Sequence, residues 1–305
     1  MNKTSNYIDK WEAVIGLEVH VQLRSRTKMF TPSEWSYGES PNTQTCPITL
    51  GYPGTLPTIN ISAIKKGILI GLSLNCDINN VTKFSRKHYF YPDLPKGYQI
   101  TQFDSPLCEN GYIDLDANKK IRITRAHLEE DAGKTIHTLE GDALIDYNRC
   151  GAPLLEIVSA PDMSSAEDAL GYLKSLKEII TSIKASDCDM EKGNLRVDLN
   201  ISVMPKGSKQ LGTRREVKNV NSFKNIEKAI HYEFINQCQK IEAGESIDQE
   251  TLLWDDKKGV TRSIRSKEDA HDYRYLPEPD LPPLEISDNL IKEIKKLIPE
   301  LPRQI

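Results

Sequence analysis

Residues 15–23 read Ile-Gly-Leu-Glu-Val-His-Val-Gln-Leu, and this stretch decides the fold class. Its odd positions are all apolar, whereas Glu18, His20 and Gln22 fall on the opposite side of an extended chain. The same alternation recurs at residues 195–203 and, more weakly, at residues 121–130. Strands with one apolar and one polar face are typical of an antiparallel sheet that is covered on one side only.

Helical periodicity separates these strands. Apolar residues spaced as on one helix face occur in residues 61–72, 166–183 and 223–234. Asn60 is placed to cap the first helix, and the pair Ser164 and Glu167 predicts a capping box for the second. Because strands and helices do not alternate regularly, the sequence predicts an α+β fold rather than a doubly wound sheet.

The composition is that of a globular protein. The 305 residues are 38% hydrophobic and 28% charged, and the net charge of −4 gives no reason to expect nucleic-acid binding through bulk charge. The best apolar run, residues 67–74, is far shorter than the roughly 20 residues of a membrane span. The first residues contain no apolar signal segment. We therefore expect a cytoplasmic protein that does not interact with membranes.

Proline placement predicts the domain organisation. Four prolines between residues 277 and 283 are too dense for a helix and indicate a rigid extended segment. We expect this segment to close a main domain over residues 1–285. Residues 286–305 then form the start of a helical domain, with a short amphipathic helix beginning near Ser287.

Glu18 and His20 are the first candidate site residues. They lie two positions apart on the polar face of the first predicted strand. Side chains so spaced are about 7 Å apart, close enough to share a metal ion or to flank a phosphate. A solvent-facing polar pair on an edge strand has the same pattern, so the alternation alone leaves both interpretations open.

A second candidate is the run of three acids Glu129, Glu130 and Asp131. Consecutive carboxylates repel one another unless a cation compensates them. Oxygen-rich groups of this kind suit Mg²⁺, whose coordination is usually completed by substrate phosphates. A charged surface loop is the alternative.

Four further stretches allow two interpretations each. Residues 83–98 mix cations with aromatic rings, which suits phosphate binding and base stacking but also a twisted hairpin. Asp198 lies on a polar strand face that is either the floor of a cleft or solvated. The charges in residues 214–218 and 273–275 are either site residues or surface ion pairs.

The P-loop and GxGxxG motifs are absent, so any binding of ATP requires a different kind of site.

Taken in order, these motifs resemble the B subunit of the aspartyl/glutamyl-tRNA amidotransferases, in its bacterial form. The resemblance covers the chain from about residue 12 to about residue 285. It rests on residues 14–23, 50–57, 83–99, 127–134, 151–159 and 216–222, and on the proline-rich stretch that ends at residue 283.

The resemblance implies a fold and an activity. Residues 1–285 would be a catalytic cradle domain similar to the glutamine synthetase/guanido kinase group. Proteins of this kind use ATP and Mg²⁺ to phosphorylate the side-chain carboxylate of misacylated Glu-tRNA(Gln) or Asp-tRNA(Asn). Ammonia from the A subunit, a glutaminase, then displaces phosphate, and the small C subunit completes the complex. The chemistry depends on positioning and on cations around the γ-phosphate.

The resemblance also implies roles for individual residues. The expected Mg²⁺ site consists of Glu18, His20 and Glu130. Further catalytic residues implied are Glu129, Asp198 and Lys83. The residues implied for binding ATP or the tRNA acceptor end are Arg86, Lys87, Lys96, Glu156, Lys218 and Arg274.

Two departures from the family pattern qualify these expectations. Some relatives carry enough cysteines between Lys28 and Pro47 to form a zinc site, whereas here only Cys46 lies in this stretch, so we expect no zinc. The chain also ends within the early helical part, so we expect it to be truncated at its C-terminal end.

Two alternative functions are also compatible with the sequence. One is a non-catalytic scaffold that docks tRNA, although several acids in one pocket would repel RNA phosphates. The other is a stand-alone carboxylate–amine ligase that acts on a free amino acid.

Overall fold

The computed structural model describes residues 5–138, 140–265 and 273–301, and a nine-stranded sheet dominates them. The strand order is β14-β13-β12-β11-β1-β10-β7-β6-β2. Every pairing in this sheet is antiparallel except that of β12 with β13. The predicted α+β class with a largely antiparallel sheet is confirmed.

Three of the nine strands of the large sheet, β1, β7 and β11, correspond to the segments in which alternation predicts a strand. The nine strands are β1 (Trp11–Gln22), β2 (Asp77–Ile78), β6 (Cys108–Asp114), β7 (Lys120–Glu130), β10 (Pro153–Ser159), β11 (Leu195–Pro205), β12 (Arg215–Lys218), β13 (Thr251–Asp255) and β14 (Val260–Arg265). The smaller sheets contain β3 (Val81–Thr82), β4 (Ser85–His88), β5 (Tyr98–Thr101), β8 (Lys134–His137), β9 (Ala143–Asp146), β15 (Leu276–Pro277) and β16 (Leu284–Glu285).

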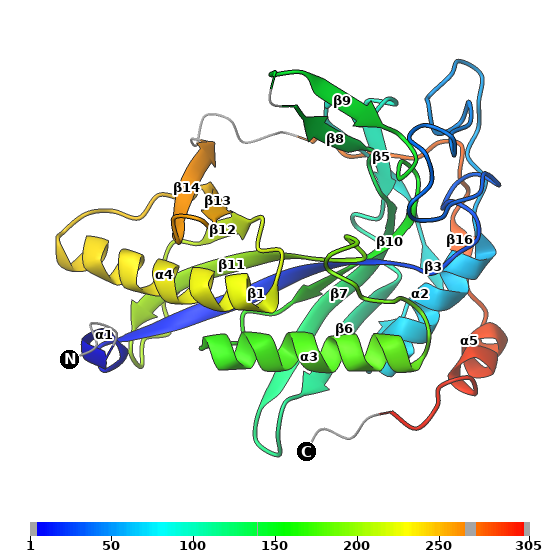
Figure 1. The fold of residues 1–305 in the computed structure, drawn as a ribbon. Helices are drawn as coiled ribbons and strands as arrows, with labels where there is room; N and C mark the ends of the chain where they lie inside the picture. Colours follow the sequence, from blue (N-terminus) through cyan, green and yellow to red (C-terminus); the bar gives the residue numbers. More distant parts are fainter. Residues whose placement is uncertain (1–4, 139, 266–272, 302–305) are drawn as a thin grey trace.

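Helices cover one face of the large sheet and leave the other to smaller elements. The helices are α1 (Ser5–Ile8), α2 (Ile61–Ser73), α3 (Ala166–Ser182), α4 (Phe223–Glu242) and α5 (Asp288–Lys295). Figure 1 shows α3 and α4 along the same side of the sheet and the β8–β9 hairpin on the other side, while β14 and β13 form one edge of the sheet itself. The apolar residues of β1 and β11 are buried in one core with the apolar stripes of α2, α3 and α4. The sheet therefore has one apolar face and one polar face, as the alternation predicts.

A β-bulge explains why the alternation in residues 121–130 is weak. In the pairing of β10 with β7, Val158 lies opposite Arg125 but the next residue, Ser159, lies opposite Ile123. The extra residue in β7 reverses the phase of the alternation at this point. Before the bulge the odd-numbered residues face the core, and beyond it the even-numbered ones do, including Leu128.

The predicted helix starts are correct with one shift. Asn60 caps α2 by accepting hydrogen bonds from two backbone N–H groups. The cap of α3 is Ser165, whose side chain accepts from the backbone N–H of Asp168, so the predicted box of Ser164 and Glu167 is wrong by one position. Ser164 instead donates from its backbone N–H to the Asp168 carboxylate.

The predicted C-terminal helix packs against the main core. Ile286 and Ile294 are both buried in the same apolar cluster as the sheet, and α5 lies against α2. The boundary at residue 285 stays a prediction, and residues 302–305 lie outside the described part of the chain. Within the described residues, no helix combines the length and apolarity needed to cross a membrane.

Candidate functional site

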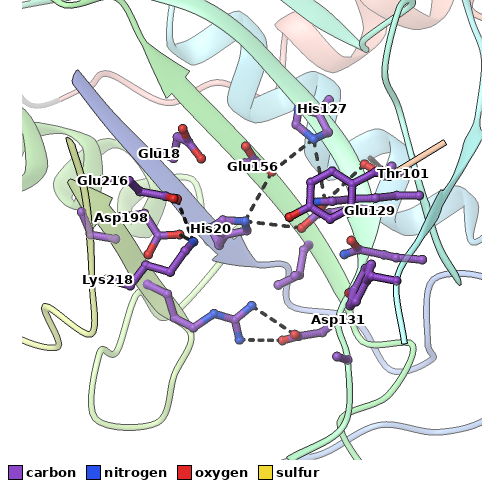
Figure 2. Close-up of a pocket in the computed structure, with 18 of the residues that line it drawn as sticks. Glu18, His20, Thr101, His127, Glu129, Asp131, Glu156, Asp198, Glu216 and Lys218 are labelled. Carbon is purple, nitrogen blue, oxygen red and sulfur yellow. Dashed lines mark hydrogen bonds and ion pairs between the residues drawn. The ribbon is translucent and has the colours of Figure 1, made fainter. Parts of the chain in front are cut away.

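A cavity of about 810 Å³ lies over the polar face of the sheet. Its floor forms because strand register brings polar residues of separate strands into rows. His20 of β1 lies between Arg196 of β11 and Glu156 of β10, and Glu156 in turn lies opposite His127 of β7. Figure 2 shows these side chains converging in one pocket.

The first group on the floor is the histidine cluster, formed by His20, Glu129 and Glu156. The Nε2 atom of His20 lies 3.5 Å from Glu129 Oε1 and 3.3 Å from Glu156 Oε2. His127 Nε2 lies 3.3 Å from Glu156 Oε2, and the Thr101 hydroxyl donates to Glu129 at 3.2 Å. One nitrogen and two carboxylate oxygens therefore face a common point (Figure 2).

The second group is the carboxylate cluster, formed by Glu18, Asp198 and Glu216. One oxygen from each lies within 4.8 Å of the others. The Lys218 ammonium bridges two of the three, at 2.7 Å from Asp198 and 2.8 Å from Glu216. The third carboxylate, Glu18, accepts a hydrogen bond of 3.0 Å from Asn200.

Neighbouring charges set the protonation of both clusters. Burial by itself would lower the pKa of His20, but Glu156 and Glu129 outweigh it and raise this pKa to about 9. Burial would raise the pKa of Glu156, yet His127 and His20 hold it well below its usual value. The pKa of Glu18 is raised by burial and then by the nearby charge of Glu156. The site thus pairs imidazolium with carboxylate in the histidine cluster and crowds negative charge in the carboxylate cluster.

Two cations near these acids, Arg196 and Lys87, have different kinds of partner. Arg196 binds both oxygens of buried Asp131, at 2.8 and 3.1 Å, which fixes one corner of the pocket. Lys87 instead lies over aromatic rings, with its Nζ 4.6 Å from the Tyr273 ring centre and 5.9 Å from that of Tyr89. In the described part of the chain, Lys87 makes no ion pair with a carboxylate. Its charge therefore faces the cavity without a carboxylate partner.

The donor atoms fit divalent ions. The histidine cluster combines an imidazole nitrogen with carboxylate oxygens, a mixed set that can hold a divalent ion such as Mn²⁺ once His20 has released its proton. The carboxylate cluster has the oxygen-only set of a hard cation such as Mg²⁺. The predicted ion site of Glu18, His20 and Glu130 is not assembled in this form. Glu18 and His20 belong to different clusters, although they lie on the same strand face.

Glu130 lies on the other side of the sheet from Glu129. Successive strand residues point to opposite faces, so the two acids cannot enter the same pocket. Glu130 is buried, accepts a hydrogen bond of 3.0 Å from the backbone of Ile100 and pairs with the ammonium of Lys96. The structure therefore corrects the placement of both Glu130 and Lys96, which serve the core beneath the pocket.

Three other predicted residues also lie away from the cavity. Lys83 is exposed at the end of β3 and lies outside the set of residues that line the pocket. Arg86 forms a double hydrogen bond with Glu278, at 2.8 and 2.9 Å, on the opposite face of the small sheet. Arg274 is exposed, with a backbone φ of 41°, whereas its neighbours on either side line the pocket. The remaining predicted residues, Glu18, His20, Lys87, Glu129, Glu156, Asp198 and Lys218, do line it.

Asp131, the last of the three acids in the predicted run, also lines the pocket. Sequence reasoning gave no site role to three other residues that line it: His127, Arg196 and Glu216. Each of these three lies on the polar side of a strand, so the alternation carried a signal for all of them. Only the register of neighbouring strands makes them adjacent to His20 or Glu18.

Comparison with known proteins shows which family the chain resembles. The family model described as the GatB/GatE catalytic domain matches residues 13–292. The chain is 53% identical over 299 residues to a protein of Caldicellulosiruptor saccharolyticus named as the B subunit of aspartyl/glutamyl-tRNA(Asn/Gln) amidotransferase, covering 97% of this chain and 62% of that protein. Proteins with the same name are 52% identical in Caldicellulosiruptor bescii, over 97% of this chain and 62% of the relative, and 53% identical in Clostridium botulinum, over 96% and 62%. The chain thus spans about 62% of the length of the curated relatives that it matches.

Proposed function

The chain belongs to the GatB/GatE catalytic domain family, and from this premise we propose that it is the catalytic part of a tRNA-dependent amidotransferase, a carbon–nitrogen ligase. The observation that carries the proposal is the pocket floor, where two clusters with the donor atoms of divalent-ion sites lie beside the ammonium of Lys87, which forms no ion pair with any carboxylate of the described residues. The proposed substrate is the side-chain carboxylate of Glu-tRNA(Gln), Asp-tRNA(Asn) or both, with ATP as the phosphoryl donor.

The proposed reaction has two steps. A carboxylate oxygen of the aminoacyl group attacks the γ-phosphorus of ATP, and ADP leaves. The nitrogen of ammonia then attacks the acyl carbon, phosphate leaves, and an amide results. Phosphorylation is needed because a free carboxylate has no adequate leaving group for ammonia.

The residues of this chain would position the reactants. The histidine cluster and the carboxylate cluster would each hold Mg²⁺, which neutralises charge on the phosphates when it is bound. Arg196 and Asp131 hold the pocket floor rigid through their paired hydrogen bonds. Lys87 would attract the anionic groups that the acids alone would repel.

The names of the relatives support a multi-subunit complex but do not name its other subunits. Those proteins are B subunits of an amidotransferase that acts on aminoacyl-tRNA. We propose that this chain likewise works in the cytoplasm with a glutaminase, the A subunit, which supplies ammonia, and with a small C subunit. Misacylated tRNA(Gln) or tRNA(Asn) would bring the carboxylate into the pocket.

The test is ADP formation by the full-length protein with its partner subunits and ammonium. Misacylated tRNA should stimulate ADP release and uncharged tRNA should not. Glu129→Gln should abolish this stimulation, whereas Glu178→Gln, on the exposed side of α3, should retain it. ATP turnover that ignores the aminoacyl group would contradict the proposal.

Two other functions would give different results in the same assay. A docking scaffold would bind tRNA but form no ADP, and Glu129→Gln would then lower tRNA affinity alone. The concentration of acids on the pocket floor argues against it, because acids repel RNA phosphates when no cation intervenes. A stand-alone ligase would turn over ATP with free glutamate or aspartate and no tRNA.

A further inference from the structure

Lys218 contacts the same carboxylates that would bind an ion in the carboxylate cluster. Its ammonium lies 2.7 Å from Asp198 Oδ2 and 2.8 Å from Glu216 Oε1. Glu18 is the third carboxylate of the cluster. Its Oε1 atom accepts a hydrogen bond from Asn200. In Figure 2 the Lys218 side chain reaches the two carboxylates from the edge of the group.

An ion and the ammonium compete for these oxygens. Mg²⁺ lies about 2.0–2.1 Å from its oxygen ligands. An ammonium that is hydrogen-bonded to the same atoms would lie only about 4 Å from the ion, and like charges at that separation repel strongly in a partly buried site. The Lys218 side chain is 41% exposed, so packing does not enclose it on all sides.

We propose that Lys218 is a tethered competitor of the divalent ion at the carboxylate cluster: its ammonium holds Asp198 and Glu216 together, and ion binding displaces it from both. The inference rests on the proposed function, which places an ion there. The displaced ammonium remains attached to β12 inside the same cavity. It then becomes available to an anionic substrate group such as a phosphate, so ion binding and substrate binding are coupled.

The opposite role for Lys218 predicts the opposite result. If Lys218 only assembled the cluster, its removal would let the carboxylates move apart and ion affinity would fall. Competition predicts that removal raises the affinity. The direction of the change therefore decides between the two roles.

The experiment measures Mn²⁺ binding by the full-length protein without tRNA or ATP, using electron paramagnetic resonance or calorimetry. A Glu156→Gln background removes one ligand of the histidine cluster, so that the carboxylate cluster dominates the signal. Asp198→Asn identifies the binding that belongs to the carboxylate cluster. Lys87→Met is the matched control, because it removes a pocket ammonium that forms no ion pair with a carboxylate of residues 5–138, 140–265 or 273–301.

Lys218→Met should bind Mn²⁺ about tenfold more tightly, equivalent to about 1.4 kcal/mol. Lys87→Met should change the affinity by less than about threefold, since only longer-range charge is lost. Lys218→Arg keeps the positive charge, so this variant should bind Mn²⁺ no more tightly than the parent. It provides a second measurement if Lys218→Met does not fold.

Unchanged or weaker binding in Lys218→Met would overturn the proposal, as would the absence of any Mn²⁺ binding that depends on Asp198. Failure of the amidotransferase proposal would show separately, as ADP formation that does not depend on misacylated tRNA while the Mn²⁺ results stand.

Discussion

His20 shows at the residue scale how the pocket changes an ordinary side chain. A buried imidazole normally loses its proton easily, because burial disfavours the charged form. Here two carboxylates within 3.5 Å reverse that effect. The sequence places His20 on a polar strand face, but its charge depends on Glu156 and Glu129, which come from two other strands.

The protonation of His20 can be tested directly. With its pKa raised from 6.5 to about 9, His20 contributes stability that is complete below pH 6.5 and is lost as the pH rises through about 9. In a chelating buffer, the imidazole should titrate near pH 9 by NMR, and Glu156→Gln should lower this midpoint. The difference in unfolding free energy between the parent and His20→Gln should shrink over the same pH range. A midpoint near 6.5 in the parent would contradict this assignment.

At the element scale, the alternation of a strand separates residues that are adjacent in sequence. Glu129 and Glu130 look equivalent in the sequence, as two members of one acidic run. In β7 they face opposite sides of the sheet, so that one belongs to the histidine cluster and the other pairs with Lys96 in the core. The β-bulge ahead of them determines which acid faces the pocket, because it sets the phase of the strand.

Substitutions at these two positions should therefore have different effects. Glu130→Ala leaves the Lys96 ammonium buried without a partner, and such broken pairs cost about 3–5 kcal/mol. This loss of stability should appear as a lower free energy of unfolding in urea, whereas the folded protein should keep its Mn²⁺ affinity. Glu129→Ala should reduce Mn²⁺ binding with a smaller loss of stability. Equal effects of the two changes on Mn²⁺ binding would show that the assignment of faces is wrong.

At the scale of the whole molecule, one core holds elements from both ends of the chain. The pocket floor draws on β1, β7, β10, β11 and β12, which span residues 11–218. Beneath it, the core extends to Ile294 of α5, which is 3% exposed. This packing provides a test of the predicted boundary at residue 285. If α5 began a separate domain, it would contribute little to the stability of the main domain.

Ile294→Ala tests that boundary. If α5 belongs to the main core, the substitution should lower the free energy of global unfolding by about 2–5 kcal/mol. Leu297→Ala is the matched control, since Leu297 is 68% exposed and its loss should change stability by no more than about 0.5 kcal/mol. A neutral result for Ile294→Ala would favour an independent C-terminal unit.

The sequence by itself determined the fold class, the helix positions and the polar faces of the strands. These features depend on local periodicity, which residues 15–23 and 195–203 display in full. Only the tertiary structure decided which polar residues meet. His20 and Glu156 are 136 positions apart, and a shift of one residue in register would turn either of them toward the core. Register and bulges arise from packing over the whole sheet, so the division of the acids into two clusters was not available from any single segment.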